Sequence, residues 1–453
     1  MTDSLRSAED FIFASYMRAR PLLRGPDERT RRPELTAQLL ATLGHPERGL
    51  PCLLVAGSKG KGSTAAFAAG LLATSGRPIG LFTSPHLLDI RERIRVDGRA
   101  IPPADFVELA RTLRSAAEPL AASLPEGAYL SPVGLLLSVA LLHFRARGVE
   151  FAVVEAGRGA RFDDTRLVEH PVAAISPVMP EHRRELGSGL ARIAWHKAGA
   201  IGPGGTAVSA SQRPAVLSVL RGEAAAQGSG LLVVGRDVPI RRHRDGRVDV
   251  ATERRHYGDL RPSLRGPHQA ENLALALAAT EALWPGLAKL PLATMQHAAA
   301  RVRWPGRSET LQERPLVLLD GAVNAASARA FLAAARPISR PPIVAIAGAP
   351  ADKDYAGLFR TLAPHVRRLY VTRASNPHLR FPPDAAKVAA RYAPSVAESA
   401  DLATAVSAAL AEVGPDGTLW IVGTQSLVAD ALRLWRKDLE DISAVPGDTE
   451  ADS

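Results

Sequence analysis

Short apolar runs alternate with longer amphipathic or alanine-rich stretches along most of the chain. Residues 51–56 (PCLLVA) predict a buried strand and residues 64–74 predict a helix, with a glycine-rich loop between them. The same alternation predicts strands at 77–83, 151–155 and 172–176, a buried helix at 135–147, and one or two N-terminal helices within 8–43. Strands that alternate with helices indicate a parallel, doubly wound sheet.

The pattern changes between residues 230 and 265, where short alternating runs and turn signals predict small antiparallel strands at the edge of the first domain. A helix at 269–283 follows, and a domain boundary is predicted near 295–303. The second α/β unit has predicted strands at 316–319, 343–347, 369–372 and 419–422. We therefore expect an N-terminal domain over 1–300, a C-terminal α/β domain over 301–441 and a flexible tail over 442–453.

Composition excludes several classes of protein. Hydrophobic residues make up 46% and charged residues 23% of the 453 positions, so wholesale disorder is excluded. Cys52 is the single cysteine, which excludes an intrachain disulfide and a zinc site built on several cysteines. The N-terminus lacks a basic flank before an apolar core, and the longest apolar stretch, 133–144, is too short to span a bilayer. We expect a cytoplasmic protein with no membrane association.

The formal net charge of +10 is compatible with nucleic-acid binding. However, the basic residues are mostly arginine and are spread through the chain, which favours a compositional bias and no nucleic-acid partner. The same bias leaves only seven lysines. A lysine retained in a glycine loop, such as Lys59 or Lys61, therefore indicates a chemical role.

The glycine loop, GSKGKGST, follows a strand and precedes a helix, as in a P-loop, but departs from the G-x-x-x-x-G-K-[ST] spacing. Glycines let backbone N–H groups close around phosphate oxygens, and the N-terminus of the next helix favours an anion. Lys61 is then expected on the terminal phosphates and Ser63 on Mg²⁺; the alternative is an ordinary glycine-rich turn. The predicted nucleotide-binding residues of the loop are Gly57, Ser58, Lys59, Gly60, Lys61, Gly62, Ser63 and Thr64.

Further motifs occur in a defined order over most of the chain: LFTSPHLLDIRERIRVDGRAIP, VVEAGRGARFDDT, EHRRELGSGLARIAWHKAGAI, RGPHQAENLALAL, RWPGR, LLDGAVN, GAPADKD and TRASNP. With the glycine loop, their order and spacing resemble the Mur ligase superfamily, specifically the folylpolyglutamate synthase and dihydrofolate synthase family. This resemblance implies a P-loop-type parallel-sheet ATPase domain with a small antiparallel subdomain, and a second, Rossmann-like α/β domain.

The resemblance also implies the reaction. The γ-phosphate of ATP is transferred to a substrate carboxylate, and the amine of an amino acid, glutamate in this family, attacks the resulting acyl phosphate. The products are an amide, ADP and phosphate, and two Mg²⁺ ions offset the charge of the anions. The implied partners are small molecules, a carboxylic acid and an amino acid, and we expect a monomer.

The resemblance assigns metal and catalytic roles to individual residues. Ser63 and Glu155 correspond to ligands of the Mg²⁺ on the β- and γ-phosphates, and His182 to a ligand of the second Mg²⁺. Lys197 corresponds to a family lysine that reacts with CO₂ to form a carbamate, which requires a neutral amine. Together, Lys61, His182 and Lys197 are the predicted catalytic residues. The alternatives are a strand-end charge for Glu155, a surface histidine for His182 and a helix-end lysine for Lys197.

On the nucleotide side, the resemblance assigns the adenine contact to Asn272, which shares a helix face with Gln269. Arg307 is implied on the phosphates and Asp320 on the ribose, both from the second domain. The alternatives are a helix cap for Asn272 and an ion pair for the other two. Lys353 is assigned either to the glutamate or phosphate side or to a salt-bridged surface loop.

On the acceptor side, the resemblance implies a substrate-binding loop that begins at Ser84, Pro85 and His86 and continues through Arg91, Glu92 and Arg93. Asp163 is also implied to contact the substrate. The alternative for the RERIR segment around Arg91 is an exposed alternating strand.

Four positions depart from the family pattern. Val133 and Gly134 replace an aromatic residue and an acid, Arg166 replaces an asparagine, and Val323 replaces a histidine. The stretch SPVMPEH, which ends at His182, replaces a glycine-containing one. Most departures lie on the acceptor side, and a flat pterin requires an aromatic face. A ligase for a non-folate acid and amino acid in specialised metabolism, and a nucleotide-binding protein without turnover, are therefore alternatives to a folate-type ligase.

Overall fold

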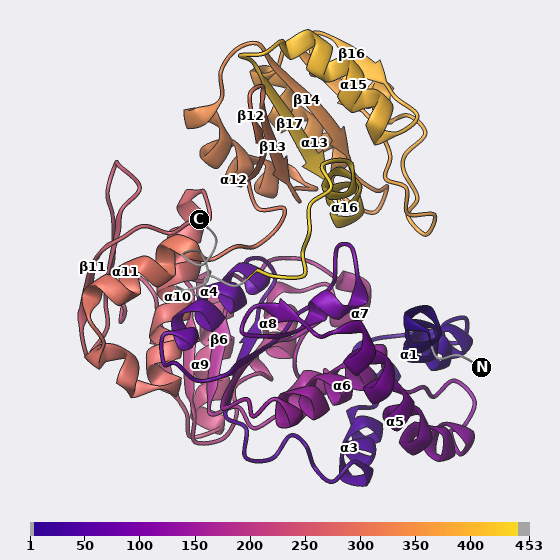
Figure 1. Cartoon of the computed structure of the whole chain (residues 1–453), viewed down its shortest axis with the longest axis vertical. Helices are drawn as coiled ribbons and strands as arrows, with labels where there is room; N and C mark the ends of the chain where they lie inside the picture. The colour runs from indigo at the N-terminus through magenta and orange to yellow at the C-terminus, as the bar shows by residue number, and fades with distance from the viewer. Residues whose placement is uncertain (1–3, 443–453) are drawn as a thin grey trace, which may run out of the picture.

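The computed structural model describes residues 4–442 and arranges them in two lobes (Figure 1). An eight-stranded sheet forms the centre of the N-terminal lobe, and a six-stranded sheet forms the centre of the C-terminal lobe. Residues 443–453 of the predicted tail lie outside the described residues. Ile442 was assigned to that tail, but it is buried and its N–H donates to the Gly98 carbonyl at 3.0 Å, so the tail prediction is wrong at this residue.

The sheet of the N-terminal lobe has the order β4-β3-β2-β5-β1-β6-β7-β8. Six neighbouring strands of this sheet run parallel: β2, β5, β1, β6, β7 and β8. At one edge, β3 pairs antiparallel with β2, and β4 pairs antiparallel with β3. Its strands are β1 Cys52–Ala56, β2 Ile79–Phe82, β3 Ile94–Val96, β4 Arg99–Ala100, β5 Phe151–Glu155, β6 Val172–Ile175, β7 Thr206–Ser209 and β8 Gly230–Val233. The central strands are buried on both faces, which explains their unbroken apolar sequences.

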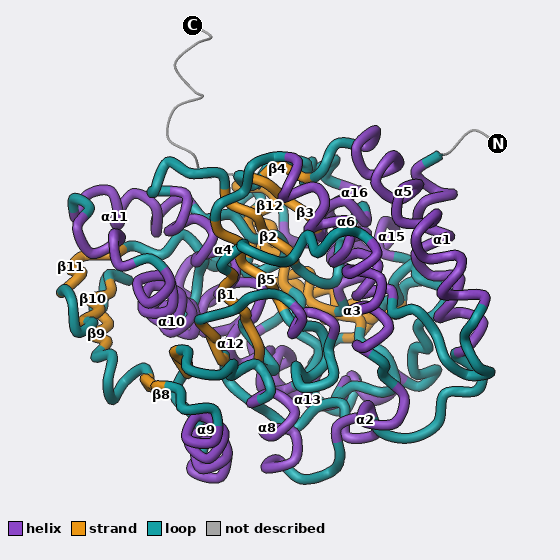
Figure 2. The backbone as a smooth tube through the Cα atoms, turned by 90° about the horizontal axis from the view of Figure 1, so that it is seen from below, coloured by secondary structure: helices purple, strands orange, loops and turns teal. Residues whose placement is uncertain are grey.

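Helices cover both faces of this sheet (Figure 2). One face carries α4 (Lys61–Ala73), α10 (Pro267–Leu283) and α11 (Leu292–Arg301), with Phe67 in the buried core. The opposite face carries α1 Leu5–Ala19, α3 Pro33–Thr42, α5 Pro103–Ala122 and α6 Pro132–Ala146. The remaining helices of this lobe are α2 Asp27–Thr30, α7 Arg183–Leu186, α8 Leu190–Ala198, α9 Pro214–Ala226, and the 3₁₀ helices η1 Ile90–Arg93, η2 Asp164–Leu167 and η3 Pro285–Lys289.

A separate three-stranded antiparallel sheet packs beside α10 and α11. It consists of β9 Ile240–Arg242, β10 Val248–Ala251 and β11 His256–Leu260. The predicted antiparallel strands are thus confirmed for these residues but wrong for β8, which pairs in parallel with β7 in the main sheet. Helix α9 lies between β7 and β8, and such a crossover connects parallel neighbours.

The C-terminal lobe has the strand order β12-β13-β17-β14-β15-β16, parallel except for the edge strand β12. Its strands are β12 Glu309–Glu313, β13 Leu316–Asp320, β14 Ile343–Gly348, β15 Arg368–Val371, β16 Val396–Glu398 and β17 Thr418–Gly423. Its helices are α12 Ala325–Ala335, α13 Tyr355–Leu362, α14 Ala385–Ala389, α15 Leu402–Val413 and α16 Gln425–Leu434, with the 3₁₀ helices η4 Arg336–Ile338 and η5 Ala363–His365. The predicted two-part α/β fold is confirmed.

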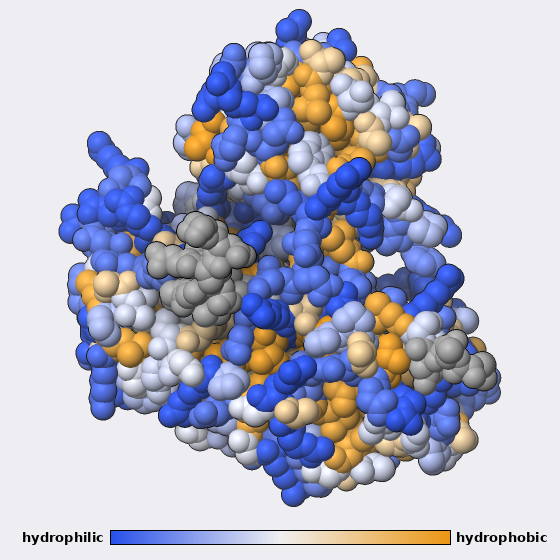
Figure 3. Space-filling view, viewed as in Figure 1, coloured by the Kyte–Doolittle hydropathy of each residue, from blue (hydrophilic) through white to orange (hydrophobic). Residues whose placement is uncertain are grey.

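The surface seen in Figure 3 is mainly hydrophilic, and apolar side chains gather there only in small groups. Such scattered apolar side chains are normal for a protein surface. Within residues 4–442, no helix has the length and apolar character needed to cross a membrane.

Candidate active site

The glycine loop lies at the carboxyl end of β1, where the chain turns directly into α4. The helix begins at Lys61, three residues earlier than the predicted start at Thr64. Gly60 makes this turn in the left-handed region, with φ 91°. The lysine of the loop is therefore the first residue of the helix, where free N–H groups and the helix dipole favour an anion.

Neighbouring residues pack so closely on the loop that three of its glycines, Gly62 among them, leave no room for a side chain. A Cβ on Gly57 would lie 2.0 Å from Ser176 Oγ, and one on Gly60 would lie 2.5 Å from Asn272 Oδ1. Gly57 and Gly60 also have positive φ angles. The loop is therefore held in one shape by its surroundings, which is the requirement for a preorganised phosphate cradle.

Lys61 faces a carboxylate from the adjacent strand. Its Nζ lies 3.8 Å from Glu155 Oε1, and the other carboxylate oxygen accepts the Ser84 N–H at 3.3 Å. Glu155 is 4% exposed. Burial raises the pKa of its carboxyl group, and Lys61 and the Ser84 N–H oppose that shift. The structure thus brings Lys61 and Glu155 together at the carboxyl ends of β1 and β5.

The other polar residues of the loop take different positions. Ser63 is buried in the first turn of α4, beside Thr64, whose Oγ1 is buried without a hydrogen-bond partner. Ser58 points toward the connection between β6 and α7, where its Oγ donates to the Met179 carbonyl at 3.2 Å. Lys59 is exposed.

Lys197 extends from α8 to the underside of the loop. Its Nζ donates to the Gly57 carbonyl at 2.6 Å and to Glu181 Oε1 at 2.8 Å, and the residue is fully buried. Burial lowers the pKa of the Lys197 amine to about 8, although Glu181 opposes that shift. Lys197 does lie in the last turn of α8, as the helix-end alternative has it, and its buried amine contacts the main chain of the glycine loop.

The immediate surroundings of Lys197 favour a cation, because both of its partners are hydrogen-bond acceptors. A carbamate on Nζ would bring a second anion against Glu181, and the two carboxylates would repel each other unless a cation lay between them. His182, next to Glu181, is exposed on the same connection and adopts φ 45°. The predicted carbamate therefore stays a prediction that requires a cation at this position.

On the predicted adenine side, Asn272 is 4% exposed and lies against Gly60. Its Nδ2 donates to Gln269 Oε1 at 2.8 Å, which confirms that both side chains share one face of α10. His268 lies one residue before Gln269, and its Nδ1 is buried without a partner. Burial and Arg307 lower the pKa of the His268 imidazole to about 4, so this ring is neutral.

Arg307 lies in the segment between the lobes, close enough to His268 for its charge to act on that ring. Asp320, at the end of β13, accepts the Ser308 N–H at 2.9 Å, and burial raises the pKa of its carboxyl group. Arg307 Nη1 donates to the Gly306 carbonyl at 2.9 Å. Lys353, by contrast, pairs with Asp352 at 2.9 Å on the surface, as the surface-loop alternative predicted.

The predicted acceptor loop starts beside Glu155, because the Ser84 N–H contacts that carboxylate and the Ser84–Pro85 peptide bond is cis. His86 Nδ1 accepts a hydrogen bond from Arg93 Nε at 3.0 Å. Burial and the Arg93 cation lower the pKa of the His86 imidazole to about 4. The His86 ring is therefore a neutral acceptor that orients the Arg93 guanidinium.

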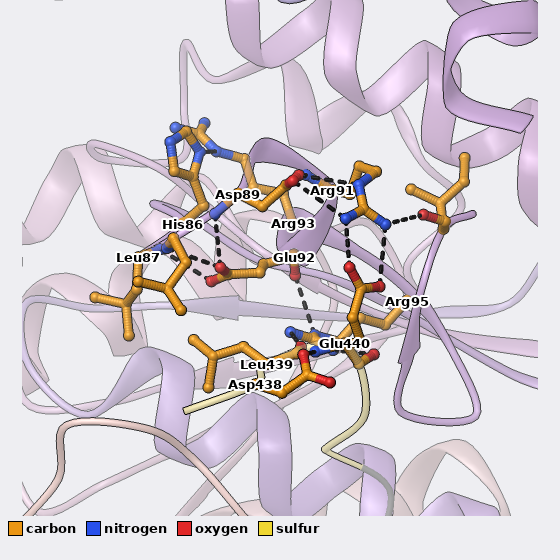
Figure 4. A network of polar contacts seen from close by, with 12 residues as sticks. His86, Leu87, Asp89, Arg91, Glu92, Arg93, Arg95, Asp438, Leu439 and Glu440 are labelled. Carbon is orange, nitrogen blue, oxygen red and sulfur yellow. Dashed lines mark hydrogen bonds and ion pairs between the residues drawn. The ribbon is translucent and has the colours of Figure 1, made fainter. Parts of the chain in front are cut away.

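Two predicted substrate contacts are occupied by other parts of the chain. The Arg91 guanidinium is buried and pairs with Asp89 and Glu440, as Figure 4 shows. Asp163 is fully buried and accepts hydrogen bonds from Arg31 Nη1 at 2.6 Å and Thr165. The predicted substrate contacts of Arg91 and Asp163 are therefore corrected, because both side chains pair with other residues of the chain. The exposed-strand alternative for RERIR is also wrong, since Arg91 lies in η1.

The unusual Gly134 is accounted for by its neighbours. A Cβ at this position would lie 2.1 Å from Thr36 Oγ1 and 3.0 Å from Asp164 Oδ1. Thr36 Oγ1 donates to that aspartate at 2.7 Å in a buried hydrogen bond. The space beside Gly134 is thus filled by a side chain of α3. Val323, the other notable departure, packs partly against the core of the C-terminal lobe.

The described residues contain no cluster of three His, Cys, Asp or Glu side chains that could hold a metal ion by itself. A nucleotide-bound Mg²⁺ requires only one or two protein oxygens, because phosphates and water supply the others. Ser63 and Glu155 meet this requirement by position, since one lies in the first turn of α4 and the other ends the strand next to β1. The residues present therefore fit a nucleotide-bound Mg²⁺.

A family model described as "Mur ligase, glutamate ligase domain" matches residues 306–425. The whole fold is similar to the crystal structure of folylpolyglutamate synthase from Mycobacterium tuberculosis complexed with ADP and AMPPCP. That similarity has a TM-score of 0.83 with 29% sequence identity, and covers 94% of this chain and 99% of that one. Fold, glycine loop and family model together define a ligase of the Mur class.

More specific similarity comes from curated relatives. The chain is 33% identical over 324 residues to dihydrofolate synthase/folylpolyglutamate synthase from Bacillus subtilis, covering 69% of this chain and 74% of the relative. It is 31% identical to a probable bifunctional folylpolyglutamate synthase/dihydropteroate synthase from Haloferax volcanii. That similarity covers 89% of this chain but about half, 48%, of the relative's length. The chain belongs to the folylpolyglutamate synthase/dihydrofolate synthase family.

Trp304, near the site, was not singled out from the sequence, and the contacts of Arg93 and Glu181 were not predicted. Trp304 packs against the loop, because a Cβ on Gly62 would lie 2.7 Å from its indole Nε1. Arg93 and Glu181 contact His86 and Lys197 as described above. The WPGR and RERIR motifs contained the first two, but nothing in the spacing of either motif indicated a contact with the glycine loop or with His86.

Proposed function

We propose that the chain is an ATP-dependent ligase that joins a carboxylic acid to the amine of glutamate through an acyl phosphate. The observation that carries this proposal is the position of Lys61. It begins a helix behind a glycine loop, 3.8 Å from a buried carboxylate at the end of the neighbouring parallel strand. This arrangement suits a phosphoryl group that has to be held in line for transfer.

On the nucleotide side, Lys61 supplies a point charge to the terminal phosphates, and N–H groups of the loop donate hydrogen bonds to the remaining phosphate oxygens. Asn272 contacts the adenine from α10. Arg307 approaches the phosphates and Asp320 the ribose from the side of the C-terminal lobe. Asn272 supports this arrangement by packing on Gly60, and the two others follow the segment that connects the lobes.

We assign the Mg²⁺ on the β- and γ-phosphates to Ser63 and Glu155, and a second Mg²⁺ to His182. When bound, these ions reduce the repulsion between the phosphates and the incoming carboxylate. Burial raises the pKa of the Glu155 carboxyl group, and a bound cation would favour its ionised form. A carbamate on Lys197 is part of this proposal, with a cation between it and Glu181.

The acceptor carboxylate attacks the γ-phosphorus and ADP leaves; the amine of glutamate then attacks the acyl carbon and phosphate leaves. Arg93 lies near this reaction, half-buried and oriented by the neutral His86. Its positive charge suits a carboxylate that approaches the terminal phosphate. Since one chain supplies both lobes, we propose that the monomer is active.

A second candidate keeps the reaction but changes the acid. Thr36 fills the space at Gly134 and donates a hydrogen bond to Asp164. Arg31 donates a hydrogen bond to Asp163. Thr36 and Asp164 thus lie beside Gly134, where the family pattern predicts an acid, and Val133 stands where it predicts an aromatic residue. They favour a non-folate carboxylic acid, because a flat pterin gains affinity from an aromatic face.

The test is release of ADP, coupled to an optical readout, with purified protein, MgATP and pairs of substrates. Dihydropteroate, tetrahydrofolate and a panel of unrelated carboxylic acids are each offered with glutamate and, in parallel, with other amino acids. The Lys61→Ala variant serves as the control for contaminating ATPases, because it lacks the charge that holds the terminal phosphates.

Glutamate-dependent ADP release with a folate acceptor supports the first candidate. Release only with another acid supports the second. If the wild-type protein binds MgATP but releases no ADP with any pair, the ligase proposal is wrong and the chain is a nucleotide-binding relative without turnover. Equal ADP release by Lys61→Ala and the wild-type protein would refute the role of Lys61.

A further inference from the structure

The chain returns to the N-terminal lobe after its last helix. Residues 438–442, which we call the strap, follow α16 and lie beside β4. Leu439 belongs to the apolar core of the C-terminal lobe, whereas Ile442 belongs to a core cluster of the N-terminal lobe. Within four positions, the strap thus passes from one lobe into the other and forms a second covalent connection between them.

Main-chain hydrogen bonds fix the strap to the edge of the first sheet. The Ala100 N–H donates to the Glu440 carbonyl at 2.7 Å, and the Ile442 N–H donates to the Gly98 carbonyl at 3.0 Å. Arg95, which is 2% exposed, donates from Nη2 to the Leu439 carbonyl at 2.7 Å. A buried arginine that donates to main-chain carbonyls gives the strap one defined register.

The Glu440 side chain continues this connection into the acceptor loop, residues 84–93 (Figure 4). Both of its carboxylate oxygens accept from the Arg91 guanidinium, one of them at 3.0 Å. The same guanidinium donates to both oxygens of Asp89 at 3.1 Å. Arg91 is therefore shared between a carboxylate of the loop and a carboxylate of the strap.

Within the loop, Glu92 is the centre of a compact turn. Its carboxylate accepts the N–H groups of Leu87, Leu88 and Asp89 at 2.9, 2.7 and 2.7 Å. Leu87 and Leu88 also pack against the apolar core of the C-terminal lobe. The loop that begins at Ser84 thus contacts both lobes, and Arg91 anchors the end opposite to Ser84.

We propose that Glu440 is a positioning residue for the acceptor side of the reaction. Through Arg91 it holds the acceptor loop in the conformation that presents Ser84 and His86 to the acid substrate. Because Glu440 stands on the strap, the loop keeps this conformation only while the strap is seated on β4. The part of this inference that concerns catalysis rests on the proposed function.

Charge and geometry together explain why a glutamate is needed at this position. A planar guanidinium binds a carboxylate through two parallel hydrogen bonds, and an amide can accept only one of them. Arg91 is 8% exposed in its side chain, so a lost partner is only partly replaced by water. Glu440 is about half exposed, and its replacement by glutamine leaves no cavity in a core.

The first test measures hydrogen–deuterium exchange by mass spectrometry on the full chain, comparing Glu440→Gln with the wild-type protein. The amides of Leu87, Leu88 and Asp89 should exchange about tenfold faster in the variant, as expected from the loss of one charge-assisted pair. Asp441→Asn is the matched control, because it removes the same charge from the next residue of the strap, which pairs with the exposed Arg99. Unchanged exchange in Glu440→Gln would overturn the proposal.

The second test separates positioning from a purely structural role. Glu440→Gln should raise the KM for the acid substrate about tenfold while the KM for ATP changes less than about twofold, because the Glu440 side chain pairs with Arg91 of the acceptor loop. Asp441→Asn should leave both values unchanged. Faster exchange without a change in the KM for the acid would show that Glu440 only stabilises the fold, and would also overturn the proposal.

The two proposals fail in different ways. Absence of ADP release by the wild-type protein with every substrate pair contradicts the proposed ligase function. Normal turnover and normal loop exchange in Glu440→Gln contradict the positioning role alone. A double variant, Arg91→Gln with Glu440→Gln, should exchange no faster than Arg91→Gln alone, because the loss of Arg91 already removes the pair with Glu440. Additive effects would refute the coupling.

Discussion

Replacement of Lys61 by methionine removes the one lysine charge beside Glu155 and keeps much of the apolar stem. The side chains of Lys61 and Glu155 are 16% and 5% exposed, so neither charge is fully screened by water. The Ser84 N–H at 3.3 Å remains as the hydrogen-bond donor to that carboxylate. We therefore predict that Lys61→Met destabilises the protein even when no nucleotide is present.

The magnitude follows from the distance between the two charges. Unit charges 3.8 Å apart attract by about 4 kcal/mol at an effective dielectric constant of about 20. Water near Lys61 and uptake of a proton by Glu155 both reduce the loss. We expect the free energy of unfolding to fall by about 2–3 kcal/mol at pH 8.

The loss should depend on pH in a defined direction. The pKa of the Glu155 carboxyl group is raised in the folded protein, so between its unfolded and folded pKa values the folded state binds more protons than the unfolded state. Stability contributed by this group therefore falls as the pH rises through that window. Lys61→Met raises the folded pKa of Glu155 further, and its effect should shrink as the pH falls toward 5 and the carboxylate takes up a proton.

The assay is urea unfolding of the wild-type protein, Lys61→Met, Glu155→Gln and the double variant at pH 8 and pH 5. In the Glu155→Gln background, Lys61→Met should cost less than about 1 kcal/mol, because no buried carboxylate is left unpaired. Equal destabilisation at both pH values, or an undiminished effect in that background, would refute the pairing of Lys61 with Glu155.

Three further predictions follow from the site. Lys197→Met should lower ADP formation about 100-fold, because a displaced Gly57 carbonyl moves the phosphate loop; partial rescue by a small carboxylate would support a carbamate, and unaffected activity would remove this lysine from the site. Gly134→Ala should destabilise the protein by about 1–3 kcal/mol in urea, because its Cβ would meet Thr36 Oγ1 at 2.1 Å; the added cost should mostly vanish in a Thr36→Ala background, and persistence there would contradict the steric explanation. Removal of Mg²⁺ by a chelator should abolish ADP formation, and Glu155→Gln should raise the Mg²⁺ concentration for half-maximal rate at least about tenfold; an unchanged requirement would exclude this carboxylate as a ligand.

Most secondary structure could be predicted from local patterns. Strands such as β1 and β5 are buried on both faces and therefore read as short apolar runs, and the helices between them follow from periodicity and alanine content. The start of α4 was missed by three residues, because the helix begins inside the glycine loop at Lys61. Strand β8 was assigned to the wrong sheet, since alternation does not reveal which neighbour a strand pairs with.

Individual site residues were predicted with mixed success, for a physical reason. Lys61 could be singled out because its chemistry depends on a local turn between a strand and a helix. Arg91 was assigned to the substrate, but its partner Glu440 is 349 positions away in the sequence. No periodicity reports a contact of that kind, because it depends on how the strap returns across β4.

The sequence by itself determined the alternation of strands and helices, the glycine loop and the residue types available for phosphate chemistry, since each depends on interactions within a few turns of chain. Only the tertiary structure decided which of those residues meet. The pairing of β1 with β5 brings Glu155 to Lys61, α8 carries Lys197 beneath Gly57, and the strap carries Glu440 to Arg91. These contacts follow from the packing of distant segments, whose free energy is a property of the whole fold.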